Sequence, residues 1–145
     1  MTESKFKTAP QPLAPVAFNI PQPFKTALAN GLRLVVFSDS RLPLVSFRLA
    51  FLTGDIHDPE ELSGLTTAMT SLLTEGTENY SSRDIAEKIE RLGASVGASS
   101  SDDFTTIYAS ALSLYLDDIV EIMAELTFRP TFPAAELDLF KRNTL

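Results

Sequence analysis

The stretch that decides the fold is Gly64-Leu65-Thr66-Thr67-Ala68-Met69-Thr70-Ser71-Leu72-Leu73-Thr74-Glu75-Gly76-Thr77. Apolar residues recur through it at steps of three and four positions, which is the period of an α-helix with one buried face: Leu62, Leu65, Met69, Leu72 and Leu73. Gly76 follows the last of them as a stop signal. The pattern predicts a helix here, and Asp58-Pro59 and Ser63 are both plausible starting points for it.

The other face of this helix carries hydroxyl groups. Thr67, Thr70, Ser71 and Thr74 share it, and no charged residue occurs between Glu61 and Glu75. A solvated helix face normally carries Glu, Lys and Arg. We therefore expect the hydroxyl face to lie against protein or a cavity.

The segments before the helix have the character of β-strands. Asn30-Gly31 is a turn signal that introduces the β-rich run 32–37, and residues 44–52 alternate between apolar and polar side chains. A short polar link separates these two runs. An antiparallel pair formed by 32–37 and 44–52 is the natural expectation.

The segments after the helix add two strands and three helices. Ser81 or Ser82 is expected to cap a helix that Gly93 ends. Strands are expected at 94–99 and 104–112, and either face of the second could be the inner one. A longer helix, capped by Ser113 and ended by Pro130, precedes a last helix with Leu137 and Phe140 facing inward. This order predicts an α+β fold, an antiparallel sheet with helices packed on one face.

The chain divides into two parts. Residues 1–29 read as an extended arm because five prolines interrupt them: Pro10, Pro12, Pro15, Pro21 and Pro23. Residues 30–145 are expected to form the folded part. The chain stops at Leu145 without a helix-terminating signal, so we expect it to be the amino-terminal portion of a longer protein.

Composition excludes several classes of partner. The net charge of −7 and the absence of a basic patch argue against nucleic acid and against an anionic membrane surface. No cysteine is present for a disulfide or a thiolate metal site. No apolar run approaches the ~20 residues that span a bilayer. Because prolines interrupt every candidate signal sequence, a cytoplasmic location is expected.

No active site is visible from residue chemistry alone. His57 is the only histidine, and zinc needs three or four protein ligands. A serine nucleophile would need a positioned base that the chain does not supply. The carboxylate pairs Asp102-Asp103 and Asp117-Asp118 are of the kind usually found solvated in a turn or on a charged helix face.

Seven short segments, taken in order, resemble the start of the pitrilysin or insulinase-like (M16) metallopeptidase family, which includes the mitochondrial processing peptidases. The resemblance covers about residues 28 to 145, and the order of the segments along the chain is more specific than any single segment. It implies the first part of a LuxS/MPP-like domain. The segments are 30–36, 41–46, Gly54-Asp55, Gly64-Leu65, 72–77, Leu92-Gly93-Ala94 and 129–133.

In that family the helix after Gly-Leu carries an inverted zinc motif, His-x-x-Glu-His. The resemblance places the two ligand histidines at Thr67 and Ser71 and the general base at Thr70. All three are replaced by hydroxyl residues, which are poor zinc ligands and no bases near neutral pH. The third ligand, a glutamate, would fall just beyond Leu145. No catalytic or metal-binding residue is therefore carried over, and zinc is expected only in a partner subunit.

The resemblance implies a degenerate homologue that has lost the zinc motif. The first interpretation is an inactive subunit that forms a heterodimer with a zinc-bearing M16 subunit and helps to enclose and bind a peptide or unfolded polypeptide for proteolysis. A homo-oligomer is also compatible. The alternatives are a structural subunit resembling the core proteins of a respiratory complex and, if the motif is misaligned, an active zinc-dependent metalloendopeptidase.

Overall fold

The computed structural model describes residue 13 and residues 21–144. The described residues fall into two compact units, divided between Ser40 and Arg41. Pro10, Pro12 and Pro15, on which the expected arm depends, lie outside the described residues.

The first unit contains a β-hairpin made of β1, Phe24–Ala27, and β2, Arg33–Val36. The connecting turn is closed where Gly31 N–H donates to the Leu28 carbonyl at 2.9 Å. Gly31 has φ +86°, a left-handed conformation that glycine adopts without steric cost. The Asn30-Gly31 turn is thus confirmed, but its first strand lies inside the range expected to be an extended arm.

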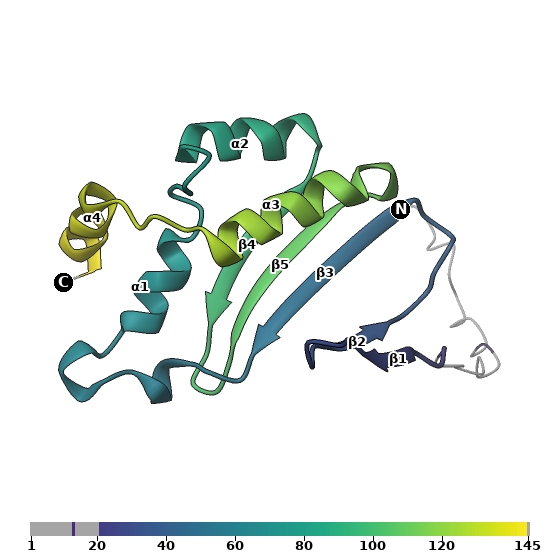
Figure 1. Cartoon of the computed structure of the whole chain (residues 1–145), viewed down its shortest axis with the longest axis horizontal. Helices are drawn as coiled ribbons and strands as arrows, with labels where there is room; N and C mark the ends of the chain where they lie inside the picture. Colours follow the sequence, from purple (N-terminus) through teal and green to yellow (C-terminus); the bar gives the residue numbers. More distant parts are fainter. Residues whose placement is uncertain (1–12, 14–20, 145) are drawn as a thin grey trace, which may run out of the picture. The chain divides into compact units, whose positions relative to one another are not determined.

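The second unit is built on a three-stranded antiparallel sheet. Its strands are β3, Leu44–Phe51, β4, Ser95–Ser100, and β5, Thr105–Leu112, in the order β3-β5-β4 (Figure 1). The expected pairing of 32–37 with 44–52 is wrong. β2 pairs with its near neighbour β1 across a tight turn, and β3 pairs along its whole length with β5. Local sequence cannot reveal this long-range pairing, because β5 follows β3 by more than fifty residues.

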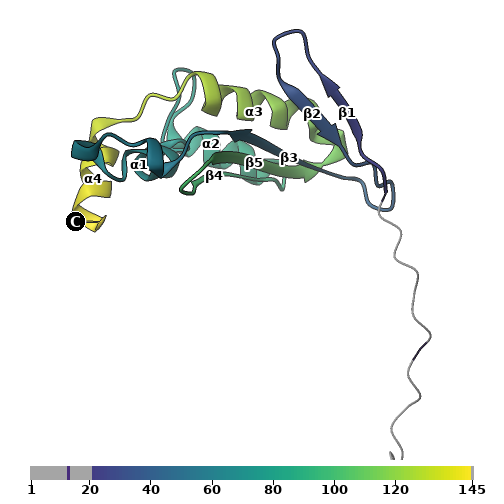
Figure 2. The same ribbon diagram turned by 90° about the horizontal axis from the view of Figure 1, so that it is seen from below.

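The helices of this unit are α1, Leu65–Leu72, α2, Ser82–Arg91, α3, Leu116–Phe128, and α4, Ala134–Thr144. Short 3-10 turns lie at Asp55–His57, Glu60–Leu62 and Ser113–Tyr115. α3 runs along β5 on one side of the sheet, and α2 lies on that side as well (Figures 1 and 2). The α+β fold with an antiparallel sheet and helices on one face is confirmed.

One of the two predicted serine caps is confirmed. The Ser81 hydroxyl accepts the Asp84 N–H at 3.2 Å, and the Asp84 carboxylate accepts the Ser81 N–H at 3.0 Å, which is a reciprocal capping box. Ser113 is not a helix cap, since it starts a 3-10 turn and Tyr115 precedes the first residue of α3. Gly93 ends α2 as predicted, with φ +57°.

The core lies between the sheet and the helices. The inner face of β5, left open by the sequence, is the one that carries Ile107, Ala109 and Ala111, each at most 3% exposed. These pack in one cluster with Ile85 of α2 and with four residues of α3: Ile119, Ile122, Met123 and Leu126. Small alanines on the central strand let the α3 backbone approach the sheet closely.

Within the described residues, no helix is long and apolar enough to cross a membrane.

Candidate functional site

The N-terminus of α1 is held by a carboxylate that precedes it in the chain. Asp58 accepts the N–H of Gly64 at 2.9 Å and that of Thr66 at 3.1 Å, and it also accepts the Thr66 hydroxyl. The hydrogen bond from the Thr66 hydroxyl is the main reason that the pKa of Asp58 lies below its usual 3.8. α1 begins at Leu65, so neither Asp58-Pro59 nor Ser63 starts it, and the Asp58 carboxylate caps the helix from outside.

Thr67 lies in the first turn of α1 and points toward two other segments. Its hydroxyl donates to the Asp55 carboxylate at 3.3 Å, and it lies 3.2 Å from the Ser100 hydroxyl at the end of β4. When Thr67 donates to Asp55, Ser100 is the donor to Thr67. One hydroxyl thereby links the helix, the 3-10 turn Asp55–His57 and the edge of the sheet.

Thr70 and Ser71 turn their hydroxyls back onto their own helix. Both donate to the Thr67 carbonyl, at 3.0 and 2.9 Å. Thr70 is only 7% exposed, whereas Thr67 and Ser71 are exposed within the described residues. The expectation that the hydroxyl face lies against protein thus holds for Thr70, for the half-buried Thr74 and for Thr67, which contacts Asp55 and Ser100, but not for the exposed Ser71.

These residues do not fit a zinc ion. The three positions carry neutral hydroxyls whose protons are engaged in hydrogen bonds, and among the residues that the structure describes Asp55 is the one carboxylate bonded to them. Within the described part of the chain, no group of three or more His, Asp or Glu side chains is placed to hold a metal. His57 is exposed, and its Nδ1 accepts the Gly54 N–H at 3.2 Å. It is a surface loop residue, as the sequence indicated.

β4 lies beside α1 at the edge of the sheet. It pairs with β5 on one side, and no described strand pairs with its other side. α1 and β4 are in contact, and Thr67 meets Ser100 where β4 ends. α4 also contacts α1, with Leu137 and Phe140 half-buried as predicted. The site therefore combines a hydroxyl-bearing helix with an unpaired strand edge.

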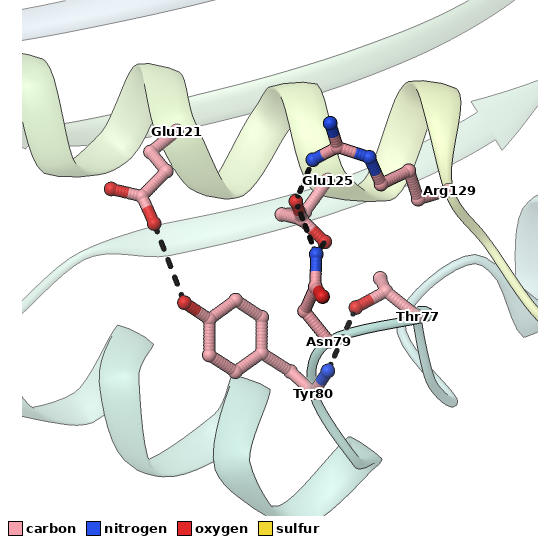
Figure 3. Close-up of polar contacts among 6 residues, drawn as sticks. All are labelled: Thr77, Asn79, Tyr80, Glu121, Glu125 and Arg129. Atoms are coloured by element: carbon pink, nitrogen blue, oxygen red, sulfur yellow. Dashed lines mark hydrogen bonds and ion pairs between the residues drawn. The ribbon is translucent and has the colours of Figure 1, made fainter.

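A second polar cluster joins α3 to the loop that follows α1 (Figure 3). Glu125 of α3 is 5% exposed, and it accepts the Asn79 side-chain amide at 3.0 and 3.1 Å and the Arg129 guanidinium. Tyr80 Oη donates to Glu121, one turn earlier on α3, at 3.4 Å. These hydrogen bonds, with the Glu125–Arg129 ion pair, anchor the loop that follows α1 to α3.

The pKa of Glu125 reflects two opposed effects. Burial is the largest single effect and raises it, but the hydrogen bonds from Arg129, Asn79 and Thr77, together with the positive charge of Arg129, outweigh burial. The pKa is lowered below its usual 4.5. The buried carboxylate therefore stays ionised at neutral pH.

Sequence reasoning brought together Thr67, Thr70 and Ser71 but missed their partners. Asp55 and Ser100 are close to α1 only in the folded chain. The sequence indicates Asp58 as part of a possible helix start, and in the structure its carboxylate reaches the free N–H groups of α1 from outside the helix. The pairs Asp102-Asp103 and Asp117-Asp118 are exposed, as expected.

Comparison with known proteins places this chain in a family. The family model described as Insulinase (Peptidase family M16) matches residues 33–144. The chain therefore belongs to the M16 peptidase family, and the resemblance noted in the sequence is confirmed.

Among individual proteins, the chain is similar to the mitochondrial-processing peptidase subunit beta of Bos taurus, with 33% identity over 128 residues, or 88% of this chain and 26% of that protein. It is also similar to YmxG of Bacillus subtilis, described as an uncharacterized zinc protease, with 30% identity over 108 residues, 74% of this chain and 26% of the relative. The chain thus spans about a quarter of the length of these relatives.

A solved structure of a peptidase M16 inactive domain from Pseudomonas fluorescens superimposes with a TM-score of 0.78 at 26% identity. The match covers 83% of this chain and 30% of that one. The similarity is thus to a family whose members include a zinc protease by name and a domain described as inactive.

Proposed function

We propose that this chain belongs to a non-catalytic M16 subunit that holds no zinc of its own, pairs with a zinc-bearing subunit and helps to enclose and bind a peptide substrate. The observation that carries the proposal is the hydroxyl triplet of α1. At the positions where the family resemblance places two histidines and a glutamate, Thr67, Thr70 and Ser71 bond to Asp55, to Ser100 and to the Thr67 carbonyl.

Peptide binding is proposed along β4. An extended peptide adds to a sheet edge by main-chain hydrogen bonds, which need no particular side chain on the strand. All residues of β4 except Val96 are small, so a second backbone can approach the strand Ser95-Val96-Gly97-Ala98-Ser99-Ser100. The solved M16 domain described as inactive supports a member of this fold without peptidase activity.

Metal content tests the proposal that this subunit holds no zinc of its own. Purified protein, dialysed and analysed by mass spectrometry for metals, should hold far less than one zinc per chain. The variants Thr67→Ala and Ser71→Ala should match the parent. Stoichiometric zinc in the parent and in both variants would reveal another metal site and remove the proposal.

Co-purification tests the proposal that this subunit pairs with a zinc-bearing subunit. Co-purification from the native source should recover an M16 subunit with an intact His-x-x-Glu-His motif, and peptidase activity should require both chains. Recovery of this protein as a homomer alone, or in a respiratory complex without such a subunit, would instead favour the structural interpretation. The cytoplasmic location stays a prediction that the same fractionation checks.

Edge binding is tested with the peptide itself. Methylation of alternate backbone amides removes the donors on one edge of an extended peptide. One of the two alternate methylation patterns should abolish binding to the protein and the other should not. Equal binding of both methylated peptides would show that β4 does not receive the substrate as a strand.

A further inference from the structure

A groove of about 510 Å³ lies between α2, β4 and the residues Thr74 and Glu75 that follow α1. Its apolar lining is supplied by Ile85 and Ile89 of α2 and by Val96 of β4. Ile85 is 3% exposed and anchors this lining to the core, while Ala86 lines the groove from the exposed side of α2. The groove therefore has a firm apolar floor and opens next to β4.

The position of this groove relative to Thr67 follows from the pleat of the strand. Val96, Ala98 and Ser100 alternate along β4 and share the face that the helices cover. Ser100 meets Thr67, and Val96 lies four residues earlier, which is about 13 Å along a strand. A peptide added to β4 thus places one side chain near Thr67 and another, four residues away, at the groove.

The groove is also negatively charged at its rim. Glu75, Glu87 and Glu90 line it with a single basic residue, Arg83. Arg83 Nε pairs with Glu87 at 2.8 Å, which leaves Glu75 and Glu90 without an ion pair among the described residues. The net charge of the chain, −7, has the same sign. A cationic side chain next to an apolar one is the complement of this lining.

We propose that this groove is a side-chain pocket for the peptide bound at β4, and that it selects an extended peptide with a large aliphatic residue flanked by a lysine or arginine. The inference rests on the proposed function, because it needs β4 to receive the peptide. The aliphatic side chain packs on Ile85, Ile89 and Val96, and the basic neighbour reaches Glu75 or Glu90.

The test uses fluorescein-labelled ten-residue peptides of Ser and Ala with one Leu and one adjacent Lys, and fluorescence anisotropy with the full-length protein. Replacing the Leu with Ser should weaken binding about tenfold or more, the scale of burying one aliphatic side chain. Replacing the Lys with Glu should weaken binding further.

Ala86→Trp fills the groove from an exposed position without touching the core. It should remove the preference for Leu and leave weak binding of the Ser/Ala peptide in place. Ala135→Trp makes the same change at an exposed site on α4 that does not line the groove, and it should retain the preference. Glu90→Gln should reduce the preference for Lys about two- to fivefold, as for a partly exposed ion pair, whereas Glu61→Gln should not.

The outcomes separate the groove from peptide binding itself. If the peptides bind with the dependence on backbone methylation described above, yet Ala86→Trp changes neither affinity nor preference, the groove is not the pocket and the proposed function stands. If no peptide binds the parent, both are overturned.

Discussion

The side-chain hydroxyls of Thr67 and Ser100 lie 3.2 Å apart and join α1 to the edge strand β4 of the sheet. In an active M16 relative the resemblance places a zinc ligand at the position of Thr67. Here a neutral hydroxyl takes that place and is satisfied by its neighbours. At the position to which the resemblance assigns a metal ligand, this chain thus has a hydrogen-bonded contact between the helix and the strand.

Zinc binding should return when histidines replace the two exposed hydroxyls. Thr67 and Ser71 are one helical turn apart, a spacing at which two side chains meet. With free zinc a hundredfold above its dissociation constant, the variant Thr67→His/Ser71→His should gain about 2.7 kcal/mol in unfolding free energy. Thermal melts with and without zinc measure this gain.

The two single variants are the controls for the zinc experiment. Each presents one imidazole, so each should respond to zinc much less than the pair. An equal stabilisation of the unmodified protein by zinc would contradict the absence of a metal site at α1.

Gly54 is predicted to be a position that accepts no side chain. A Cβ there would lie 2.1 Å from the Ser101 carbonyl oxygen and 2.7 Å from two other backbone atoms of the β4–β5 turn. Backbone cannot move aside as a side chain can, so Gly54→Ala should lower the unfolding free energy by about 3 kcal/mol or more. Urea denaturation measures the loss.

Gly97→Ala is the matched control for Gly54→Ala. Its Cβ would also clash, at 2.6 Å, but with the side-chain hydroxyl of Tyr108, which can rotate away. We expect a loss of about 1 kcal/mol. Equal losses in the two variants would show that backbone approach is not what requires glycine at position 54.

Much of the fold could be predicted from local signals. Three elements follow from patterns within a few residues of sequence. They are the helix that Gly93 ends, the neighbouring strands β4 and β5, and the strand predicted from the alternation of residues 44–52. The pairing of β3 with β5 could not be predicted, because it joins residues more than fifty positions apart. The unexpected strand Phe24–Ala27 was hidden by nearby prolines.

The candidate site could be predicted only in part for the same reason. Thr67, Thr70 and Ser71 lie on one helix, so their shared face follows from the period of 3.6 residues. Asp55 and Ser100 reach Thr67 from a 3-10 turn and from β4, and Glu125 meets Asn79 across 46 positions. Such contacts depend on tertiary packing, which composition and spacing do not encode.

The capping box at α2 should contribute measurable stability. The Ser81 hydroxyl accepts the Asp84 N–H, and the Asp84 carboxylate accepts the Ser81 N–H. Ser81→Ala should cost about 1 kcal/mol in unfolding free energy, as for other N-cap serines. Ser82→Ala, one residue into the helix, should cost much less, and a reversed order in urea denaturation would contradict the cap.

Acid should destabilise the protein through Glu125. Its pKa is lowered by folding, so the ionised carboxylate contributes stability that is fully present above the unfolded-state value near 4.5 and is lost as pH falls through the folded-state pKa below it. Glu125→Gln should therefore be less stable than the parent at neutral pH, and the difference should shrink below pH 4.5. Asn79→Ala removes the amide donor from the same carboxylate and should raise the pKa of Glu125.

Melting temperatures measured between neutral pH and the acid limit of folding report both effects. Glu121→Gln, an exposed change one turn away on the same helix, is the control. A gap between parent and Glu125→Gln that stays constant into acid would mean that the buried carboxylate is not stabilised in its ionised form.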